Sequence, residues 1–240
     1  MVELKDFYPT PKHLINKMLS SVNLYEITTI LEPSAGKGDI IDYIKEEHKY
    51  NNFSRYDIEC IEYNIDLRNI LKGKGYKVVY DDFLTFNTFK KYDLILMNPP
   101  FSEGDKHLLK ALELQKDGGQ VVCLLNAETI KNPYSVYRKD LVRKLDELNA
   151  SVEYLQDQFT SEDTFRKTDV EIALIKVNIP PKERKSKILQ GLKQSFYHTE
   201  DDEKIKNELI SSNFIEGLIQ QYEFEMQAGI KLINEYNAIK

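Results

Sequence analysis

Residues 93–101 have the sequence DLILMNPPF, and this stretch decides the fold. Four apolar residues between a charge and two prolines predict a fully buried strand that carries Asn98 at its carboxyl end. Two consecutive prolines fix φ and have no N–H, so the carbonyls of Asn98 and Pro99 stand in a rigid loop without a local donor. With the Asn98 amide oxygen and the flat ring of Phe101, these acceptors suit a planar molecule that bears an exocyclic amine.

Residues 28–39, TTILEPSAGKGD, form a second informative stretch and are followed by apolar residues at helical spacing. A β-rich run, a loop of small residues and an amphipathic helix predict the first strand-turn-helix unit of a doubly wound α/β sheet. Gly36 and Gly38 let the backbone approach a ligand closely. This is not a phosphate-binding loop, and Ile41 stands where a dinucleotide-binding loop needs its third glycine.

Two more units of this kind are predicted at residues 56–71 and 76–83. Glu62 falls at the end of the first strand, where a carboxylate can accept hydrogen bonds from both hydroxyls of a ribose. The next strand ends at Asp82 and Phe83. Polar side chains at three successive strand ends, Glu32, Glu62 and Asp82, favour one ligand site at that edge of the sheet.

Apolar spacing predicts the remaining elements. Upstream of the sheet, residues 7–11 form an extended arm that leads into a helix, with Thr10 as the N-cap and Pro11 as the first helical residue. Downstream, we expect helices at 108–114 and 137–148 and strands at 120–125, 152–155 and 171–177. The expected total is seven strands.

Three stretches resemble motifs of one enzyme class. Asn98-Pro99-Pro100-Phe101 looks like the catalytic motif of the amino-group DNA methyltransferases, which use S-adenosylmethionine (SAM). Residues 32–38, EPSAGKG, resemble the acidic-Pro-x-x-Gly-x-Gly motif of class I methyltransferases. Residues 7–11, FYPTP, are similar to the N-terminal motif of the γ-order adenine-N6 enzymes. The resemblance covers Phe7 to about Val177 and implies a Rossmann-like, seven-stranded sheet, mostly parallel with an antiparallel last strand.

The resemblance also implies how SAM would be held. The N-terminal arm closes over the methionine end, so Tyr8 and Thr10 offer hydroxyls and backbone to the SAM carboxylate. The loop of residues 34–38 wraps the aminoacyl part, and Glu32 interacts with the amino group. The expected cofactor-binding residues are Tyr8, Thr10, Glu32, Ser34, Ala35, Gly36, Gly38, Glu62, Tyr63, Asp82, Phe83 and Asn98.

On the nucleoside side, Ile61, Tyr63 and Asn64 at the strand end are expected to flank the adenine. The resemblance implies that Asp82 accepts from its amino group and that Phe83 packs nearby. The expected catalytic residues are Asn98, Pro99, Pro100 and Phe101. Hydrogen bonds from the substrate amine to the Asn98 side chain and the Pro99 carbonyl would favour a pyramidal nitrogen, with its lone pair directed at the SAM methyl group.

Aromatic side chains are expected to bind the substrate base. A base inside a duplex cannot reach such a pocket, so base flipping follows, with Phe101 stacking on the extruded ring. Phe165, in the polar loop before the last strand, is favoured over Phe159 for the other side of that ring. Cytosine-C5 methylation is excluded because it needs a cysteine nucleophile, and neither Cys60 nor Cys123 lies in a matching loop.

Residues 181–240 differ in character from residues 1–180, which form the expected catalytic domain. Related enzymes usually carry a substantial target-recognition domain after the seventh strand, and about sixty residues are small for a domain. Target recognition is therefore missing, supplied by a partner subunit or cut away. A broad apolar stripe predicts a helix or helix pair that packs on the domain or forms a partner surface. The stripe comprises Ile205, Leu209, Phe214, Ile215, Leu218, Ile219, Tyr222, Met226, Ile230, Ile233 and Tyr236.

Composition bounds compartment and partners. No apolar run spans a bilayer and the first residues have no signal-peptide character, which predicts a cytoplasmic protein. The two cysteines and four histidines have no metal-ligand spacing, so no metal is expected, and both cysteines read as buried apolar residues. The net charge of −6 does not favour a nucleic-acid partner. Basic residues do gather at 131–144 and 182–187, as solvated helix faces or as DNA contacts.

The leading interpretation is a DNA adenine-N6 methyltransferase of a restriction-modification or phage-defence type, with SAM as cofactor and DNA as partner. One alternative is a SAM enzyme that acts on RNA guanine N2 or on a protein glutamine, against which the N-terminal arm argues. Another is a subunit that keeps the fold and works only in a complex. The presence of Glu32, Glu62, Asp82 and Asn98 argues against loss of catalysis.

Overall fold

The chain divides into two compact units, Met1–Lys182 and Glu183–Lys240. In the second unit, Tyr222, Met226 and Ile230 of the predicted apolar stripe are helical and exposed. No helix in the described part of the chain is long and apolar enough to cross a lipid bilayer. The computed structural model describes residues 9–20, 22–47, 56–156, 171–182, 222–223, 225–226 and 229–230.

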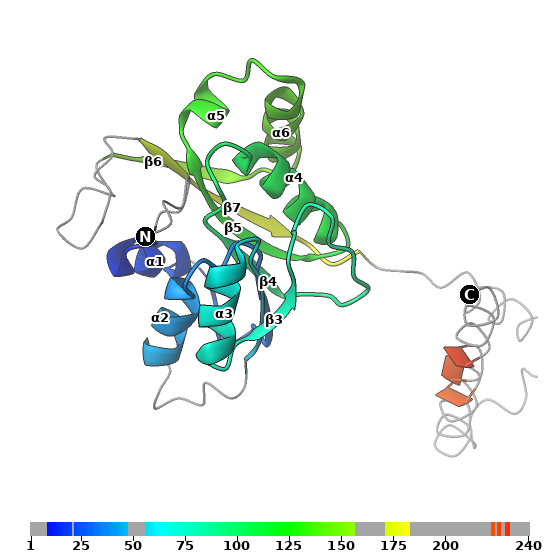
Figure 1. Cartoon of the computed structure of the whole chain (residues 1–240). Helices are drawn as coiled ribbons and strands as arrows, with labels where there is room; N and C mark the ends of the chain where they lie inside the picture. Colours follow the sequence, from blue (N-terminus) through cyan, green and yellow to red (C-terminus); the bar gives the residue numbers. More distant parts are fainter. Residues whose placement is uncertain are drawn as a thin grey trace, which may run out of the picture. The chain divides into compact units, whose positions relative to one another are not determined.

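Among the described residues, seven strands form one sheet in the order β3-β2-β1-β4-β5-β7-β6 (Figure 1). Neighbouring strands from β3 to β5 pair in parallel, whereas β7 lies antiparallel between β5 and β6. This confirms the predicted seven-stranded α/β sheet. The order reverses between β1 and β4, the kind of switch point where open α/β sheets bind ligands. The strands are β1 (Thr29–Glu32), β2 (Asp57–Ile61), β3 (Lys77–Tyr80), β4 (Leu94–Met97), β5 (Gly119–Asn126), β6 (Ser151–Leu155) and β7 (Ile172–Ile179).

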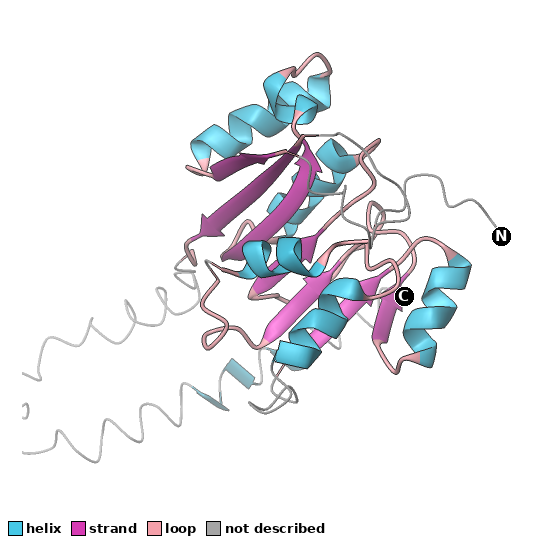
Figure 2. Ribbon diagram, turned by 90° about the vertical axis from the view of Figure 1, so that its left-hand side faces the viewer, coloured by secondary structure: helices cyan, strands magenta, loops and turns pink. Residues whose placement is uncertain are grey.

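Helices lie against both faces of the sheet (Figure 2). Buried side chains of the first three helices belong to clusters on one face, and those of α4 and α6 belong to the cluster on the other. The four-residue α5, which follows β5, was not predicted. The helices are α1 (Lys12–Leu19), α2 (Asp39–Glu47), α3 (Ile65–Gly73), α4 (Gly104–Leu114), α5 (Glu128–Lys131) and α6 (Val136–Glu147).

β4 is buried on both faces, as its sequence predicts. Leu94 and Leu96 belong to the cluster that contains α1 and α2, whereas Ile95 and Met97 belong to the cluster that contains α4 and α6. All four side chains are 0% exposed. Successive strand residues point to opposite faces, so a sheet covered on both sides requires an entirely apolar strand. Asn98 therefore follows directly after a strand that is fixed by packing on two sides.

The start of α1 corrects one prediction. Pro11, and not Thr10, occupies the N-cap position, with φ −63° and ψ 147°, and no side chain caps the helix. The Pro11 carbonyl instead accepts hydrogen bonds from the N–H groups of Leu14 and Ile15, each at 3.0 Å. The physical reason is that the Thr10 hydroxyl is bonded elsewhere, to the Asn98 side chain.

Candidate functional site

A cleft of about 360 Å³ lies where the loops after β1, β2, β3 and β4 meet the first turn of α4. It occupies the edge of the sheet at which the strand order reverses, where a ligand site is expected. Six residues predicted for the site line it together: Ser34, Glu62, Tyr63, Asp82, Phe83 and Pro100. The other lining residues are Pro33, Asp81, Leu84, Glu103 and His107.

The loop between β1 and α2 turns at Gly38, whose φ is 87°. A Cβ atom at this position would lie 2.9 Å from the Tyr76 ring and 3.0 Å from Leu71, so glycine is required both by conformation and by space. The Gly38 N–H donates to the Ala35 carbonyl at 2.7 Å, and the Ala35 N–H donates to the Ile61 carbonyl at 3.0 Å. The loop is thereby closed on itself and tied to the end of β2.

Glu62 links the loops after β1 and β2. Its Oε2 accepts from the Gly36 N–H at 2.7 Å, and its Oε1 accepts from the Asn64 N–H at 2.8 Å. Burial raises the pKa of the Glu62 carboxyl, while these two backbone donors act in the opposite direction. Each carboxylate oxygen has a second lone pair, so Glu62 can also accept from a pair of ligand hydroxyls in the cleft that it lines.

Glu32, at the end of β1, is 2% exposed. Burial raises its pKa well above the ordinary value, and the negative charges of Asp39 and Glu62 raise it further. Its Oε2 has no hydrogen-bond partner among the residues that the structure describes. A buried carboxylate beside two others is unfavourable unless it takes up a proton or pairs with a cation, so the end of β1 suits a positively charged ligand group.

Asp82 and Phe83 form the wall of the cleft that follows β3. The Asp82 Oδ1 accepts from the Leu84 N–H at 2.9 Å and keeps its remaining acceptor capacity toward the cleft. Phe83 is 2% exposed, so it contributes one side of its ring to the cleft and packs with the core. The pair therefore offers an acceptor beside an apolar surface, which is what an aromatic base with an amino group requires.

His107 completes this wall and was not predicted. Its ring centroid lies 5.7 Å from that of Phe83, and its Nδ1 lies 3.0 Å from the Glu103 carbonyl. Burial lowers the pKa of His107, which favours the neutral imidazole. Since the contact to a carbonyl places the proton on Nδ1, Nε2 is left as an acceptor. The sequence did offer one signal for this residue: His107 lies on the same helix face as the buried residues Gly104, Leu108 and Ala111.

The Asn98–Phe101 loop adjoins the cleft through Pro100. The Asn98 Nδ2 donates to the Thr10 Oγ1 at 3.0 Å, across 88 residues of sequence. Phe101 is half-buried and packs against the cluster that contains α1. The Pro100 carbonyl accepts from the Glu103 N–H at 3.1 Å, which joins the loop to the start of α4. The loop is thus braced at both of its ends.

The structure does not place every predicted site residue at the cleft. The residues that line the cleft do not include Thr10, Glu32, Ala35, Gly36, Gly38, Asn98, Pro99 or Phe101. Thr10 is bonded to Asn98, and Gly36 is bonded to Glu62 in the cleft wall. Tyr8, Phe159 and Phe165 lie outside the described residues. Most of the second basic run, residues 182–187, is also outside them. Predictions for these positions remain predictions.

Three basic residues of the run between residues 131 and 144, Lys131, Arg143 and Lys144, form ion pairs with nearby acids. Arg143 lies 2.5 Å from Asp140 and 2.6 Å from Glu147, and Lys131 lies 2.5 Å from Glu171. Such exposed pairs are typical of solvated helix faces and contribute little to stability. Of the two interpretations of this run, the structure favours the solvated face.

The two cysteines are buried, as predicted. Burial raises the pKa of Cys60 to about 12 and also raises that of Cys123, so both remain protonated thiols. Neither is a nucleophile at neutral pH.

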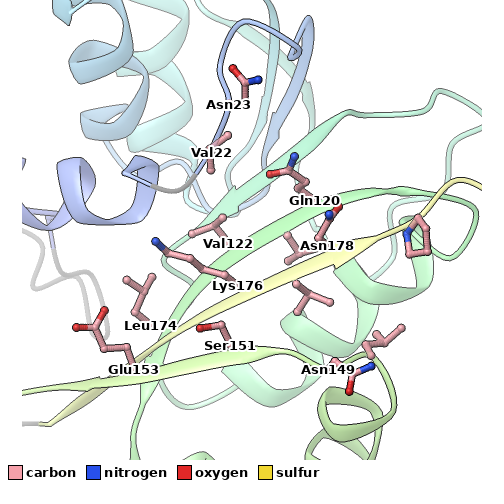
Figure 3. Close-up of a pocket in the computed structure, with 14 residues that line it drawn as sticks. Val22, Asn23, Gln120, Val122, Asn149, Ser151, Glu153, Leu174, Lys176 and Asn178 are labelled. Atoms are coloured by element: carbon pink, nitrogen blue, oxygen red, sulfur yellow. The ribbon is translucent and has the colours of Figure 1, made fainter.

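A second, larger hollow of about 640 Å³ lies on the face of the sheet formed by β5, β7 and β6 (Figure 3). Val122, Leu174 and Lys176 form its base, and Val22 lies at its margin. The Lys176 Nζ donates to the Lys17 carbonyl at 3.1 Å. No predicted site residue lines this hollow, whereas six of them line the smaller cleft. We therefore assign the functional site to the smaller cleft.

No protein-family model matches the chain. Type II methyltransferase M.CvrRI of Paramecium bursaria Chlorella virus XZ-6E is 30% identical over 92 residues, which make up 38% of this chain and 23% of that protein. The tRNA1(Val) (adenine(37)-N6)-methyltransferase of Flavobacteriaceae bacterium (strain 3519-10) is 30% identical over 77 residues, 31% of this chain and 33% of that protein. The matches thus span about a quarter and a third of these curated relatives.

Solved structures share the fold. One is described as a class I S-adenosylmethionine-dependent methyltransferase from Listeria monocytogenes, with a TM-score of 0.53, 13% identity, and coverage of 76% of this chain and 66% of that chain. Another is described as a modification subunit of a type I restriction enzyme from Vibrio vulnificus YJ016, with a TM-score of 0.52, 15% identity, and coverage of 75% and 46%. The fold of this protein is that of the class I SAM-dependent methyltransferases.

Proposed function

We propose that this protein is a SAM-dependent methyltransferase that acts on the exocyclic N6 amine of adenine in nucleic acid, with DNA as the leading substrate. The observation that carries the proposal is the position of residues 98–101 at the carboxyl end of β4, with Pro100 lining the cleft. The same cleft gathers Glu62 and Asp82, which the motifs predicted as cofactor ligands from two separate strand ends.

The groups around the cleft fit SAM. Glu32 supplies a buried carboxyl group that can pair as a carboxylate with the amino group of the cofactor, and its Oε2 lacks a partner among the described residues. Glu62 supplies two acceptor oxygens for the ribose hydroxyls, and Phe83 with Asp82 offers an apolar surface and an acceptor for the adenine. SAM, when bound, supplies a methyl group on a positively charged sulfur that is a good leaving group.

Asn98 and Pro99 are proposed to orient the substrate amine. The lone pair of an adenine amine is delocalised into the ring, which makes the nitrogen a poor nucleophile. Acceptors at the Asn98 Oδ1 and the Pro99 carbonyl hold the amine protons so that the nitrogen becomes pyramidal and its lone pair is directed out of the ring plane. A neutral amide is not a base, so these residues position the amine and do not take its proton.

Two relatives bear on the choice between DNA and RNA adenine as substrate. The viral type II methyltransferase supports DNA, and the tRNA adenine-N6 methyltransferase supports RNA as a second candidate. The likeness to a modification subunit supports the need for a partner that recognises the target. Guanine N2 and protein glutamine are weaker candidates, since the tRNA relative is named for adenine.

The test is transfer of tritiated methyl from SAM to unmethylated genomic DNA, to unmodified tRNA and to a protein extract, followed by nuclease digestion to identify the labelled base. Asn98→Ala removes the proposed acceptor, and Asn132→Ala is the matched control because Asn132 is exposed beyond α5. We expect N6-methyladenine from the wild type and from Asn132→Ala, and at least a 100-fold lower rate from Asn98→Ala, on the order of removing one transition-state contact.

Label in RNA adenine alone would replace DNA by RNA in the proposal. Label in guanine or protein would refute the adenine assignment. If SAM binds and no substrate is labelled, addition of a candidate recognition subunit distinguishes partner dependence from a wrong assignment.

A further inference from the structure

Thr10 is buried and is bonded both to the Asn98–Phe101 loop and to the start of α2. It is 8% exposed, and its hydroxyl accepts from the Asn98 Nδ2 at 3.0 Å. Its backbone N–H donates to the carboxylate of Asp39, the first residue of α2. One residue therefore joins the N-terminal segment, the loop after β1 and the end of β4.

The Thr10 hydroxyl is held by the core rather than by a flexible loop. Pro11 follows at once and starts α1, whose side chains Leu14, Ile15 and Met18 are at most 1% exposed. Displacement of the Thr10 backbone would disturb this packing as well as the bond to Asp39. The position of the hydroxyl is thus fixed independently of any ligand.

The chemistry at Asn98 depends on which way its amide faces. The two orientations of an asparagine amide have nearly the same shape, but they exchange an acceptor for a donor. Only an oxygen can accept the protons of a substrate amine, whereas an NH₂ group in the same place would oppose them. In the structure the Asn98 Nδ2 donates to the Thr10 hydroxyl, and this arrangement places Nδ2 on the Thr10 side of the amide and Oδ1 on the other side.

We propose that Thr10 is a positioning residue: its hydroxyl holds the Asn98 amide in the orientation that presents Oδ1 to the substrate amine. The inference rests on the proposed function and assigns Thr10 a task other than the one expected from the N-terminal motif, contact with the cofactor carboxylate. The hydroxyl proton is still available to such a carboxylate, so the two tasks must be separated by experiment. A cofactor contact affects SAM affinity, and a positioning role affects the rate at saturating SAM.

The experiment compares Thr10→Val, which keeps the shape and removes the hydroxyl, with Thr10→Ser, which keeps the hydroxyl. Thr29→Val is the matched control, because the Thr29 Oγ1 also accepts one hydrogen bond, from the Asp93 N–H at 2.9 Å, at the amino end of β1. For each variant, the single-turnover rate on nucleic acid at saturating SAM, the SAM Kd and the thermal midpoint are measured.

We expect Thr10→Val to lower the single-turnover rate about tenfold, the equivalent of one hydrogen bond. Thr10→Ser should recover most of that rate, and Thr29→Val should change the thermal midpoint without changing the rate. A higher SAM Kd with an unchanged rate in Thr10→Val would assign Thr10 to the cofactor and overturn the inference. If Thr10→Val folds poorly, Thr10→Ala against Thr10→Ser makes the same comparison, since those two differ only in the hydroxyl.

A second readout needs no substrate. The ¹⁵N side-chain amide signal of Asn98, identified by its absence in Asn98→Asp, should show slow proton exchange in the wild type and in Thr10→Ser, and faster exchange in Thr10→Val. Equal exchange in all three refutes the positioning role even in an active enzyme. A wild type that transfers no methyl group even with a candidate recognition subunit added, but shows the expected exchange pattern, refutes the proposed function and leaves the bond itself established.

Discussion

Gly38→Ala is expected to destabilise the protein strongly, and two other glycines separate the reasons. Gly38 combines a φ of 87° with a Cβ position 2.9 Å from the Tyr76 ring. That ring is restrained because the Tyr76 hydroxyl donates to the Asp42 carboxylate. Gly75 has a φ of 79° and no atom within 4 Å of its Cβ position. Gly73, the last residue of α3, has open space within 4 Å and no positive φ.

The magnitudes follow from these differences. Alanine in the left-handed region costs about 1–2 kcal/mol, which is the whole effect expected for Gly75→Ala. Overpacking adds about 1–3 kcal/mol, so Gly38→Ala should lower the free energy of unfolding by about 2–5 kcal/mol. Gly73→Ala should raise it by up to about 1 kcal/mol, because alanine is the better helix former.

Urea unfolding followed by circular dichroism measures all three differences, provided that the m-values agree. From most to least stable, the expected order is Gly73→Ala, wild type, Gly75→Ala and Gly38→Ala. Equal values for Gly38→Ala and Gly75→Ala would refute the argument that the Tyr76 contact constrains this loop. Gly38→Ala should also weaken SAM binding more than Gly75→Ala does, because its loop leads from β1 into the proposed cofactor site.

Three other predictions use buried groups. The raised pKa of Glu32 means that the free energy of unfolding falls as pH rises above the ordinary carboxyl pKa of 4.5 and through the folded-state pKa. Glu32→Gln should flatten that loss and weaken SAM binding at least tenfold. Calorimetry that shows tighter SAM binding would contradict this. The lowered pKa of His107 acts in the opposite sense, because the free energy of unfolding falls as pH drops below 6.5. Unfolding curves of His107→Gln at several pH values should lack this loss at low pH. A pH profile of stability that is unchanged in the variant would argue against the prediction. The Tyr92 hydroxyl donates to the Glu59 Oε2 at 2.5 Å, so Tyr92→Phe should cost about 1–2 kcal/mol in urea unfolding, and a neutral result would show that the bond has no net value.

Much of the fold was predictable because its signals are local. The apolar run of β4 and the glycine-rich turn after β1 each predict their structure from about ten consecutive residues, and the structure confirms both. The antiparallel direction of β7 followed only from the family resemblance, since a strand's direction in a sheet leaves no trace in its own sequence. The short α5 lacks a full period of apolar residues, so no pattern announced it.

The residues of the cleft were likewise predictable only where the signal is local. Glu62 and Asp82 were found because each follows a strand end, a position that the sequence marks. His107 and the bond between Thr10 and Asn98 were missed because they depend on which helix and which arm pack beside the loop. The Thr10 side chain had two competing acceptor roles, helix cap and partner of Asn98, and packing across 88 residues decided between them.

Glu62 acts as a non-covalent cross-link. Its two carboxylate oxygens accept from the backbone N–H groups of Gly36 and Asn64, which are far apart in sequence. The spacing between the loops after β1 and β2 is therefore set before a ligand binds. A nucleoside that binds there pays little for ordering the backbone, and its affinity reflects contacts rather than loop folding. Shortening this one side chain by a single methylene, as in Glu62→Asp, would release two loops at once.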